Sequence, residues 1–138
     1  MIVGAVLLAT LVGVAAVRWS GEDIRAPDAG VAVTRQLRFE DLPDGSVAVI
    51  DGRSGLLVQK VEGEAGFLRG TMRGLARERR RAGLGNEQAF ELIGRADGRL
   101  TLHDPATGVK VDLESFGPVN AAVFAQFLPH QSADRDQP

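Results

Sequence analysis

The chain has 138 residues, a formal net charge of -2 and no cysteine. This length suits one small globular domain with attached segments. The lack of cysteine excludes disulfides, thiolate catalysis and cysteine-based metal sites. The mild charge argues against nucleic-acid binding driven by overall charge.

The first predicted element is an uncharged apolar segment, Ile2–Val17, which is followed by Arg18 and Trp19. As a helix it would be roughly 24 Å long, somewhat short of the roughly 30 Å hydrocarbon core. Arg18 can reach the interface, and Trp19 is a typical interfacial anchor. The alternative is a cleaved signal peptide that ends near Val14–Ala16, but no basic residue precedes the apolar run. We therefore predict a transmembrane anchor over residues 1–19.

Small residues recur at every fourth position of this anchor, at Ala5, Ala9 and Gly13. Such a stripe allows close helix–helix contact in lipid, so we predict that these residues and Trp19 pack in the membrane. A single N-terminal span followed by a folded domain most often leaves that domain outside the cytoplasm. The apolar run has no polar lead, so we expect further residues before Met1 in the full gene product.

A linker and a three-stranded meander are predicted next. Residues 20–33 contain glycine and proline without hydrophobic periodicity, which is typical of a linker. From Thr34 onward apolar and polar residues alternate, with turns at Pro43–Gly45 and Gly52–Gly55. This alternation and the Asp-Gly turn chemistry predict antiparallel strands.

The segment Phe67–Gly85 contains six arginines and one glutamate, and it predicts a helix that is closed by Gly83 and the residues after it. Residues three and four apart are neighbours on a helix, so four of the arginines share one sector. These four are Arg69, Arg73, Arg77 and Arg80. The opposite stripe is apolar and is expected to pack on a core; it consists of Leu68, Met72, Leu75 and Ala76. We predict that the basic sector binds a partner. The alternative is a solvated face on a helix that packs only on its own domain.

Three further positions of this helix are unusual. Arg79 falls inside the apolar stripe, so it must extend to solvent, pair with a carboxylate, or mark a helix that has already ended. Gly70 and Gly74 form a third sector, and each glycine costs roughly 1 kcal/mol relative to alanine in a helix interior. We predict that these glycines allow a partner to approach closely.

The same order of elements recurs 53 positions later. The matching residues are Asp44-Gly45 and Asp97-Gly98, Val47 and Leu100, Val49 and Leu102, Asp51 and Asp104, and Gly55 and Gly108. A second helix is expected to start near Pro118, a favourable first-turn residue. The predicted fold class is α+β, with an N-terminal transmembrane helix followed by a duplicated βββα domain with antiparallel sheet over residues 34–129. Residues 130–138 are polar and predict a flexible tail.

Residues that could carry catalysis are sparse. His103 and His130 are far apart and lack the spacing of metal ligands. The recurring aspartates lie at turns, where they usually bond the backbone. No nucleophile elbow, phosphate-binding loop or dinucleotide fingerprint is present in the sequence. We therefore predict a non-enzymatic protein with no cofactor and no metal.

Several blocks of the sequence resemble one known family. They are Asp44–Val47, Phe67–Gly70, Arg73–Arg79, Asp97–Leu100, Asp104–Gly108 and Phe116–Ala122. Together they resemble the photosynthetic complex assembly protein family known as PuhC, over nearly all of residues 34–128. The likeness implies a single-span inner-membrane protein with a cytoplasmic N-terminus and a periplasmic domain in an anoxygenic phototroph.

The resemblance also implies partners. The expected ones are reaction centre subunits, core light-harvesting polypeptides, other assembly factors and membrane lipid. The first hypothesis is an assembly factor that helps to build or reorganise the reaction centre and its core antenna. The second is a resident structural subunit of that complex. The third, a membrane-tethered periplasmic enzyme, is disfavoured because the sequence contains no recognisable catalytic constellation.

Overall fold

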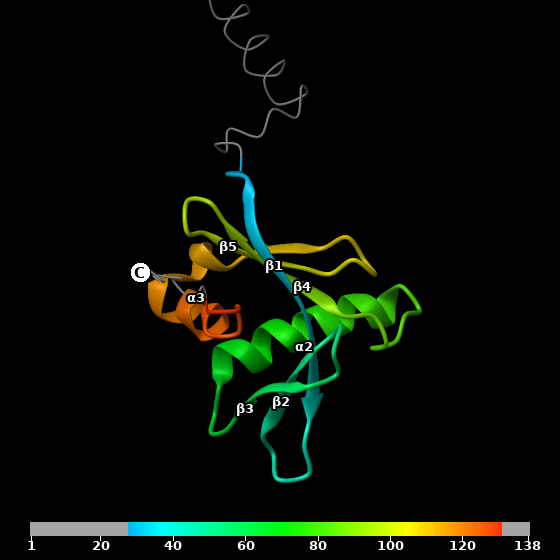
Figure 1. The fold of residues 1–138 in the computed structure, drawn as a ribbon. Helices are drawn as coiled ribbons and strands as arrows, with labels where there is room; N and C mark the ends of the chain where they lie inside the picture. Colours follow the sequence, from blue (N-terminus) through cyan, green and yellow to red (C-terminus); the bar gives the residue numbers. More distant parts are fainter. Residues whose placement is uncertain (1–27, 131–138) are drawn as a thin grey trace, which may run out of the picture.

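Six strands form one antiparallel sheet in the order β3-β2-β1-β4-β5-β6 (Figure 1). The computed structural model of the chain describes residues 28–130. The first half contains β1 (Val31–Asp41), β2 (Val47–Asp51), β3 (Leu57–Val61) and helix α2 (Gly66–Arg81). The second half contains β4 (Phe90–Arg95), β5 (Leu100–His103), β6 (Lys110–Asp112), the short 3-10 helix η1 (Leu113–Phe116) and helix α3 (Pro118–Ala125).

The two halves meet at the pair formed by β1 and β4 in the middle of the sheet. Leu37 and Phe90, which are 53 positions apart, lie directly opposite each other in this pair. The neighbouring hairpins also correspond, because Arg38 pairs with Ile50 and Glu91 pairs with His103. The predicted order of three strands and a helix therefore occurs twice, and the halves are arranged about the centre of one sheet.

The second turn of each half has the same hydrogen bonds. The backbone N–H of Asp51 donates to Leu56 O at 2.9 Å, and that of Asp104 donates to Val109 O at 2.8 Å. Gly55 and Gly108 follow with φ values of 73° and 78°. Only glycine adopts this left-handed conformation without steric cost, which explains why both turns contain it.

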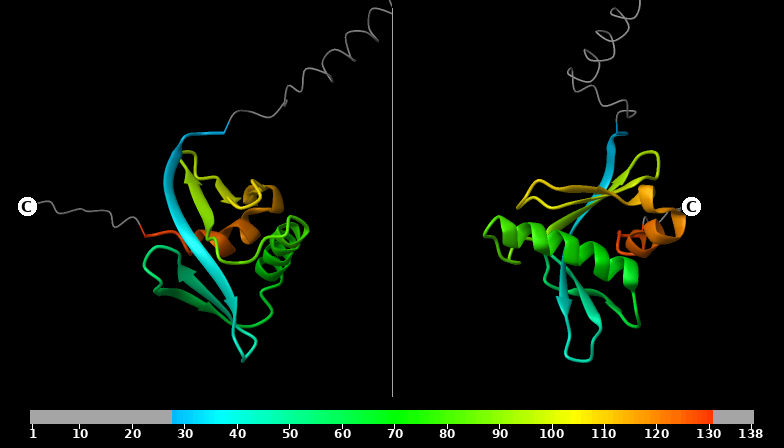
Figure 2. Two further views of the ribbon diagram at one scale, coloured as in Figure 1. Left: turned by 90° about the vertical axis from the view of Figure 1, so that its right-hand side faces the viewer. Right: turned by 180° about the vertical axis from the view of Figure 1, so that it is seen from behind.

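Both helices pack on the same face of the sheet (Figure 2). Alternate residues of the central strands point to this face, and Leu37, Leu92 and Leu102 are fully buried there. Leu68 of α2 and Phe124 of α3 complete the same hydrophobic cluster. Fully burying one such side chain contributes about 1.5–3 kcal/mol, so this cluster holds the helices to the sheet.

The helix boundaries follow local sequence signals. Helix α2 ends at Arg81, and Gly83 follows with a φ of 73°, which is typical of a helix terminus. Helix α3 starts at Pro118, as predicted, but ends at Ala125. Its last turn is followed by a backbone hydrogen bond from Phe127 N–H to Phe124 O, which places Phe127 in the core.

The predicted α+β class with an antiparallel sheet and two helices is confirmed. One boundary needs correction, because β1 starts at Val31 and residues 31–33 belong to the sheet rather than to the predicted linker. Within residues 28–130 no helix is both long and apolar enough to cross a membrane.

The predicted anchor at residues 1–19 lies outside the described residues. Its packing residues Ala5, Ala9, Gly13 and Trp19 do so too, as does the predicted tail from residue 131 onward. The division of the chain into anchor, linker, domain and tail stays a prediction.

Candidate partner-binding surface

Three arginines on α2 face solvent without partners. Arg73, Arg77 and Arg80 are exposed, and none of them makes a hydrogen bond or ion pair with another described residue. An arginine in the last turn of a helix interacts favourably with the helix dipole, which accounts for part of the preference for Arg80. Arg73 and Arg77 lie in the middle of α2, so the dipole does not explain them.

Arg69, which the sequence groups with these residues, is held within the domain. Its Nε donates to Glu64 O at 3.0 Å, and its Nη2 donates to Gly45 O. Its Nη1 lies 3.7 Å from a carboxylate oxygen of Asp41. The side chain therefore ties the first turn of α2 to the β1–β2 turn. A helical wheel cannot show this role, because the acceptors belong to loops.

Gly70 and Gly74 have open space beside them. A Cβ added at either position would have no atom within 4 Å, apart from chain neighbours and the local helix backbone. Packing inside the domain therefore does not require glycine at these two positions. They lie among the exposed arginines on α2, so the six predicted partner-binding residues do share one helix, with Arg69 engaged elsewhere.

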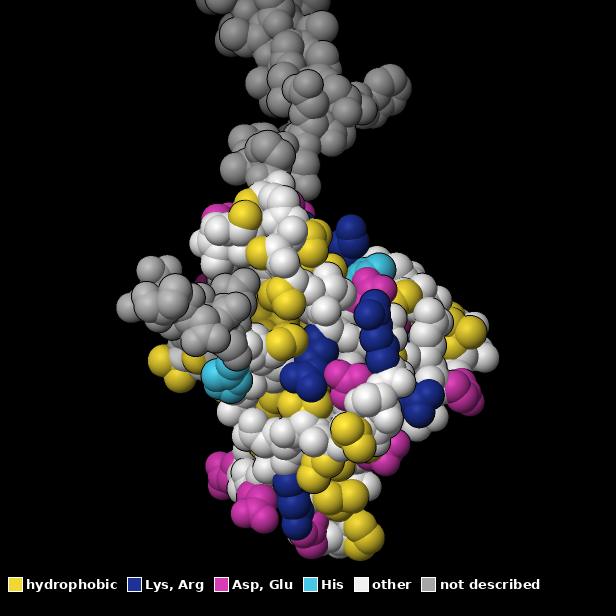
Figure 3. Space-filling view, viewed as in Figure 1, with side chains coloured by type: hydrophobic (Ala, Val, Ile, Leu, Met, Phe, Trp, Pro, Cys, Tyr) yellow, Lys and Arg dark blue, Asp and Glu magenta, His cyan; other side chains and the backbone are white. Residues whose placement is uncertain are grey.

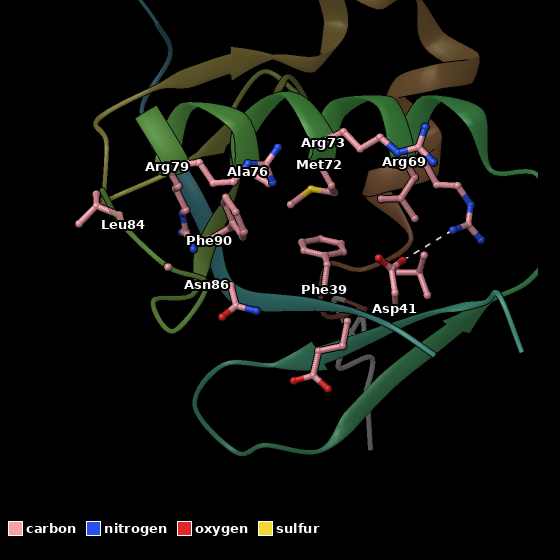
Figure 4. A pocket seen from close by; sticks show the side chains of 15 residues that line it. Phe39, Asp41, Arg69, Met72, Arg73, Ala76, Arg79, Leu84, Asn86 and Phe90 are labelled. Carbon is pink, nitrogen blue, oxygen red and sulfur yellow. Dashed lines mark ion pairs between the residues drawn. The ribbon is translucent and has the colours of Figure 1, made fainter. Parts of the chain in front are cut away.

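A groove runs between α2 and β1, and we call it the α2–β1 groove (Figure 4). Its volume is about 690 Å³. The apolar residues that line it include Phe39, Val47, Leu68, Met72, Ala76, Leu84 and Phe90. Arg73 and Arg80 line it from the helix side, and Glu40 lines it from the strand side. At one end the ion pair of Arg69 and Asp41 spans the groove. Sequence reasoning missed the groove, since it depends on how two distant elements pack.

The deepest polar contact of the groove belongs to Arg79. This side chain is only 3% exposed, and it forms a bidentate ion pair with Asp104 through Nε at 2.8 Å and Nη2 at 2.7 Å. Its guanidinium carbon also lies 4.0 Å from the centre of the Phe90 ring, a cation–π contact. Of the three alternatives for Arg79 in the apolar stripe, the structure shows the carboxylate partner.

The remaining nitrogen of Arg79, Nη1, is buried and has no hydrogen-bond partner among the described residues. Burial alone would raise the pKa of Asp104, but hydrogen bonds from Arg79 and from the backbone N–H of Ala106 outweigh it and hold that pKa below its usual value. Asp104 is thus a carboxylate, and the pair carries both charges.

The equivalent aspartate of the first half uses a different arginine. Asp51 accepts a hydrogen bond from Arg35 Nε at 3.0 Å, and Arg35 Nη1 donates to Phe127 O at 3.0 Å. The backbone N–H of Ser54 and the Arg35 guanidinium lower the pKa of Asp51 to about 2. Sequence reasoning treated both aspartates as turn residues and missed Arg35.

The sheet face away from the helices carries a mixture of acidic and basic side chains (Figure 3). One pair is His103 Nδ1 and Glu91 Oε2, which are 2.9 Å apart. Within the described part of the chain, no three histidine, aspartate or glutamate residues are arranged to hold a metal ion. The polar groups on this face are therefore engaged with each other, in contrast to the arginines of α2.

A domain built as two βββα halves, with one basic helix exposed, places the chain among surface-binding domains in its architecture. The family model described as photosynthetic complex reorganisation protein PuhC matches residues 32–133. Because this match covers more than half of the sequence, the chain belongs to the PuhC family of photosynthetic complex reorganisation proteins. No curated protein and no solved structure matches the chain.

Proposed function

We infer that the chain is a non-enzymatic membrane protein that assists assembly or reorganisation of the photosynthetic reaction centre and its core light-harvesting complex. Family membership supports the link to photosynthetic complexes. The proposed route is a single span over residues 1–19 in the inner membrane, with a cytoplasmic N-terminus and the α+β domain in the periplasm. The domain then contacts the periplasmic surfaces of the complex, and the span contacts lipid and neighbouring helices.

One observation carries the proposed contact, namely the exposed arginines of α2 that lack partners in residues 28–130. Arg73 and Arg77 are one helical turn apart and flank the open position at Gly74. Arginine recognises carboxylates through two parallel hydrogen bonds. A partner surface with aspartate or glutamate would therefore pair with these residues, and Gly70 and Gly74 would let its backbone approach.

The test is co-purification of the full chain with reaction centre and core antenna polypeptides from a phototrophic bacterium. In the Arg73→Glu/Arg77→Glu variant we expect at least a tenfold loss of recovered partners. The matched control is Arg53→Glu/Lys110→Glu, which changes the total charge equally at two exposed positions away from α2. Full recovery with the α2 variant would contradict the proposed surface.

The resident-subunit alternative predicts a different outcome in the same cells. A resident subunit would be present in mature complexes in stoichiometric amount, and complex levels would be normal after its deletion. An assembly factor would be substoichiometric in mature complexes, and its deletion would lower their level.

A further inference from the structure

We propose that the α2–β1 groove binds an extended segment of a partner polypeptide that carries a carboxylate beside apolar side chains. The proposal deepens the proposed function, on which it rests for the origin of the segment. The groove is a separate feature from the outer face of α2, because Gly70, Gly74 and Arg77 do not line it.

The first support is the unsatisfied donor inside the groove. Arg79 lines the groove, and Figure 4 shows its side chain descending from α2 toward Phe90 and Asn86. Its Nη1 is buried without an acceptor in the described chain. An unpaired buried donor costs about 1–3 kcal/mol, and more for a charged group. An oxygen acceptor from a bound segment would remove this cost.

The second support is the charge along the helix side of the groove. Arg73 and Arg80 line it and have no partner among the described residues. On the opposite side, Asp41 is engaged by Arg69, and Glu40 is exposed. The positive potential is therefore strongest along α2 and at Arg79. A carboxylate of the ligand is expected on this side, where arginine offers bidentate hydrogen bonds.

The third support is the apolar lining. Met72 and Phe39 point toward each other across the groove (Figure 4), and Leu84 at one end is 40% exposed. The volume of about 690 Å³ falls in the range of pockets that bury most of a ligand. Apolar side chains of a bound segment would cover these groups, and the adjacent carboxylate would determine its orientation.

The dimensions favour an extended segment over a helix. The lining runs along α2 from Leu68 to Arg80, which spans about 18 Å at 1.5 Å per residue. With the volume given above, the mean cross-section is about 40 Å², whereas a helix 10 Å across needs about 80 Å². The groove thus accommodates a single extended strand of polypeptide.

The experiment selects peptides from a displayed library of random decapeptides on the full chain and then measures their binding as synthetic peptides. We expect enrichment of aspartate or glutamate next to leucine or phenylalanine. Binding of the selected peptide should weaken at least tenfold in Ala76→Phe, which fills the groove. It should also weaken at least tenfold in Arg80→Gln, which keeps the groove open and removes one charge.

Two controls separate groove binding from general effects. Ala122→Phe makes the same change at an exposed position of α3, and Arg53→Gln removes an exposed charge in the β2–β3 turn. Neither change should alter the affinity by more than twofold. The proposal is overturned if no peptide is enriched, if the enriched peptides lack acidic residues, or if neither groove variant weakens their binding.

The two proposals fail in distinguishable ways. If peptides do not bind while Arg73→Glu/Arg77→Glu still abolishes co-purification, the groove proposal is wrong and the proposed function stands. If peptide binding depends on the groove while co-purification is unaffected, the proposed partner surface is wrong and the groove remains a binding site.

Discussion

Arg79 and Asp104 form a buried bidentate ion pair that joins helix α2 of the first half to the turn after β5 in the second half. Asp104 is fully buried and Arg79 nearly so. In the first half the matching aspartate, Asp51, pairs with Arg35 of β1 instead. The repeated turn therefore supplies an aspartate twice, and each half satisfies it with a different arginine. This difference places α2 across the middle of the sheet, where it faces the groove.

Breaking this pair should destabilise the domain strongly. Asp104→Asn keeps the volume but leaves the Arg79 charge buried without compensation, which costs about 3–5 kcal/mol. The matched control is Asp51→Asn, in which Arg35 retains solvent contact, with an expected loss of about 1–2 kcal/mol. Urea denaturation of the full chain measures both. Equal losses for the two variants would show that burial of Arg79 adds nothing.

Stability should fall at acid pH because several carboxyls have lowered pKa values. The pKa of Asp51 is lowered to about 2, and those of Asp44 and Asp104 are also lowered. A carboxyl with a lowered folded pKa stabilises the fold above its unfolded pKa of about 3.9 and loses this contribution as the pH falls through the folded value. For Asp51 the window is about pH 4 to 2.

Denaturation at pH 5, 3 and 2 measures this loss. The share of Asp51 should be roughly 1–2 kcal/mol after screening by solvent, and Asp51→Asn should lack this share. A variant whose stability falls as steeply as that of the parent chain would show that Asp51 does not contribute.

The α2 glycines should be replaceable without loss of stability. Gly70→Ala and Gly74→Ala add a methyl group to open space, and each should raise the free energy of unfolding by about 0.5–1 kcal/mol. The control is Gly52→Ala, whose Cβ would lie 2.8 Å from Ala89 Cβ and should destabilise. If the glycines serve a partner, the two stabilised variants should also co-purify less of it. Destabilisation by either α2 change would contradict this description of the helix.

Arg69 and Arg73 should behave differently although both are arginines of the same predicted sector. Arg69→Gln removes donors to two backbone carbonyls and should cost about 1–3 kcal/mol of stability. Arg73→Gln should change stability by less than about 0.5 kcal/mol, because Arg73 contacts no partner among the described residues. Thermal or urea unfolding compares the two, and a larger effect at Arg73 would overturn the distinction.

The features that are visible in the sequence are those with short-range signals. The 53-residue recurrence of Asp-Gly turns predicts the two halves, and the position of Arg79 in an apolar stripe demands one of three explanations. The partner of Arg79 could not be chosen, because Asp104 is distant along the chain and also suits a turn. Arg69 was grouped with the exposed arginines because its acceptors are loop carbonyls, which carry no side-chain signal. The α2–β1 groove arises only when α2 and β1 pack together.

The most direct test of the central claim is site-specific photocrosslinking from position 77 in intact photosynthetic membranes. A photoreactive residue replaces Arg77 on the exposed face of α2, and an identical substitution at Arg53 is the control. We predict that position 77 crosslinks to a reaction centre or core light-harvesting polypeptide and that position 53 does not. Crosslinking at position 53 alone, or none at position 77, would contradict the assignment of α2 as the partner-binding surface.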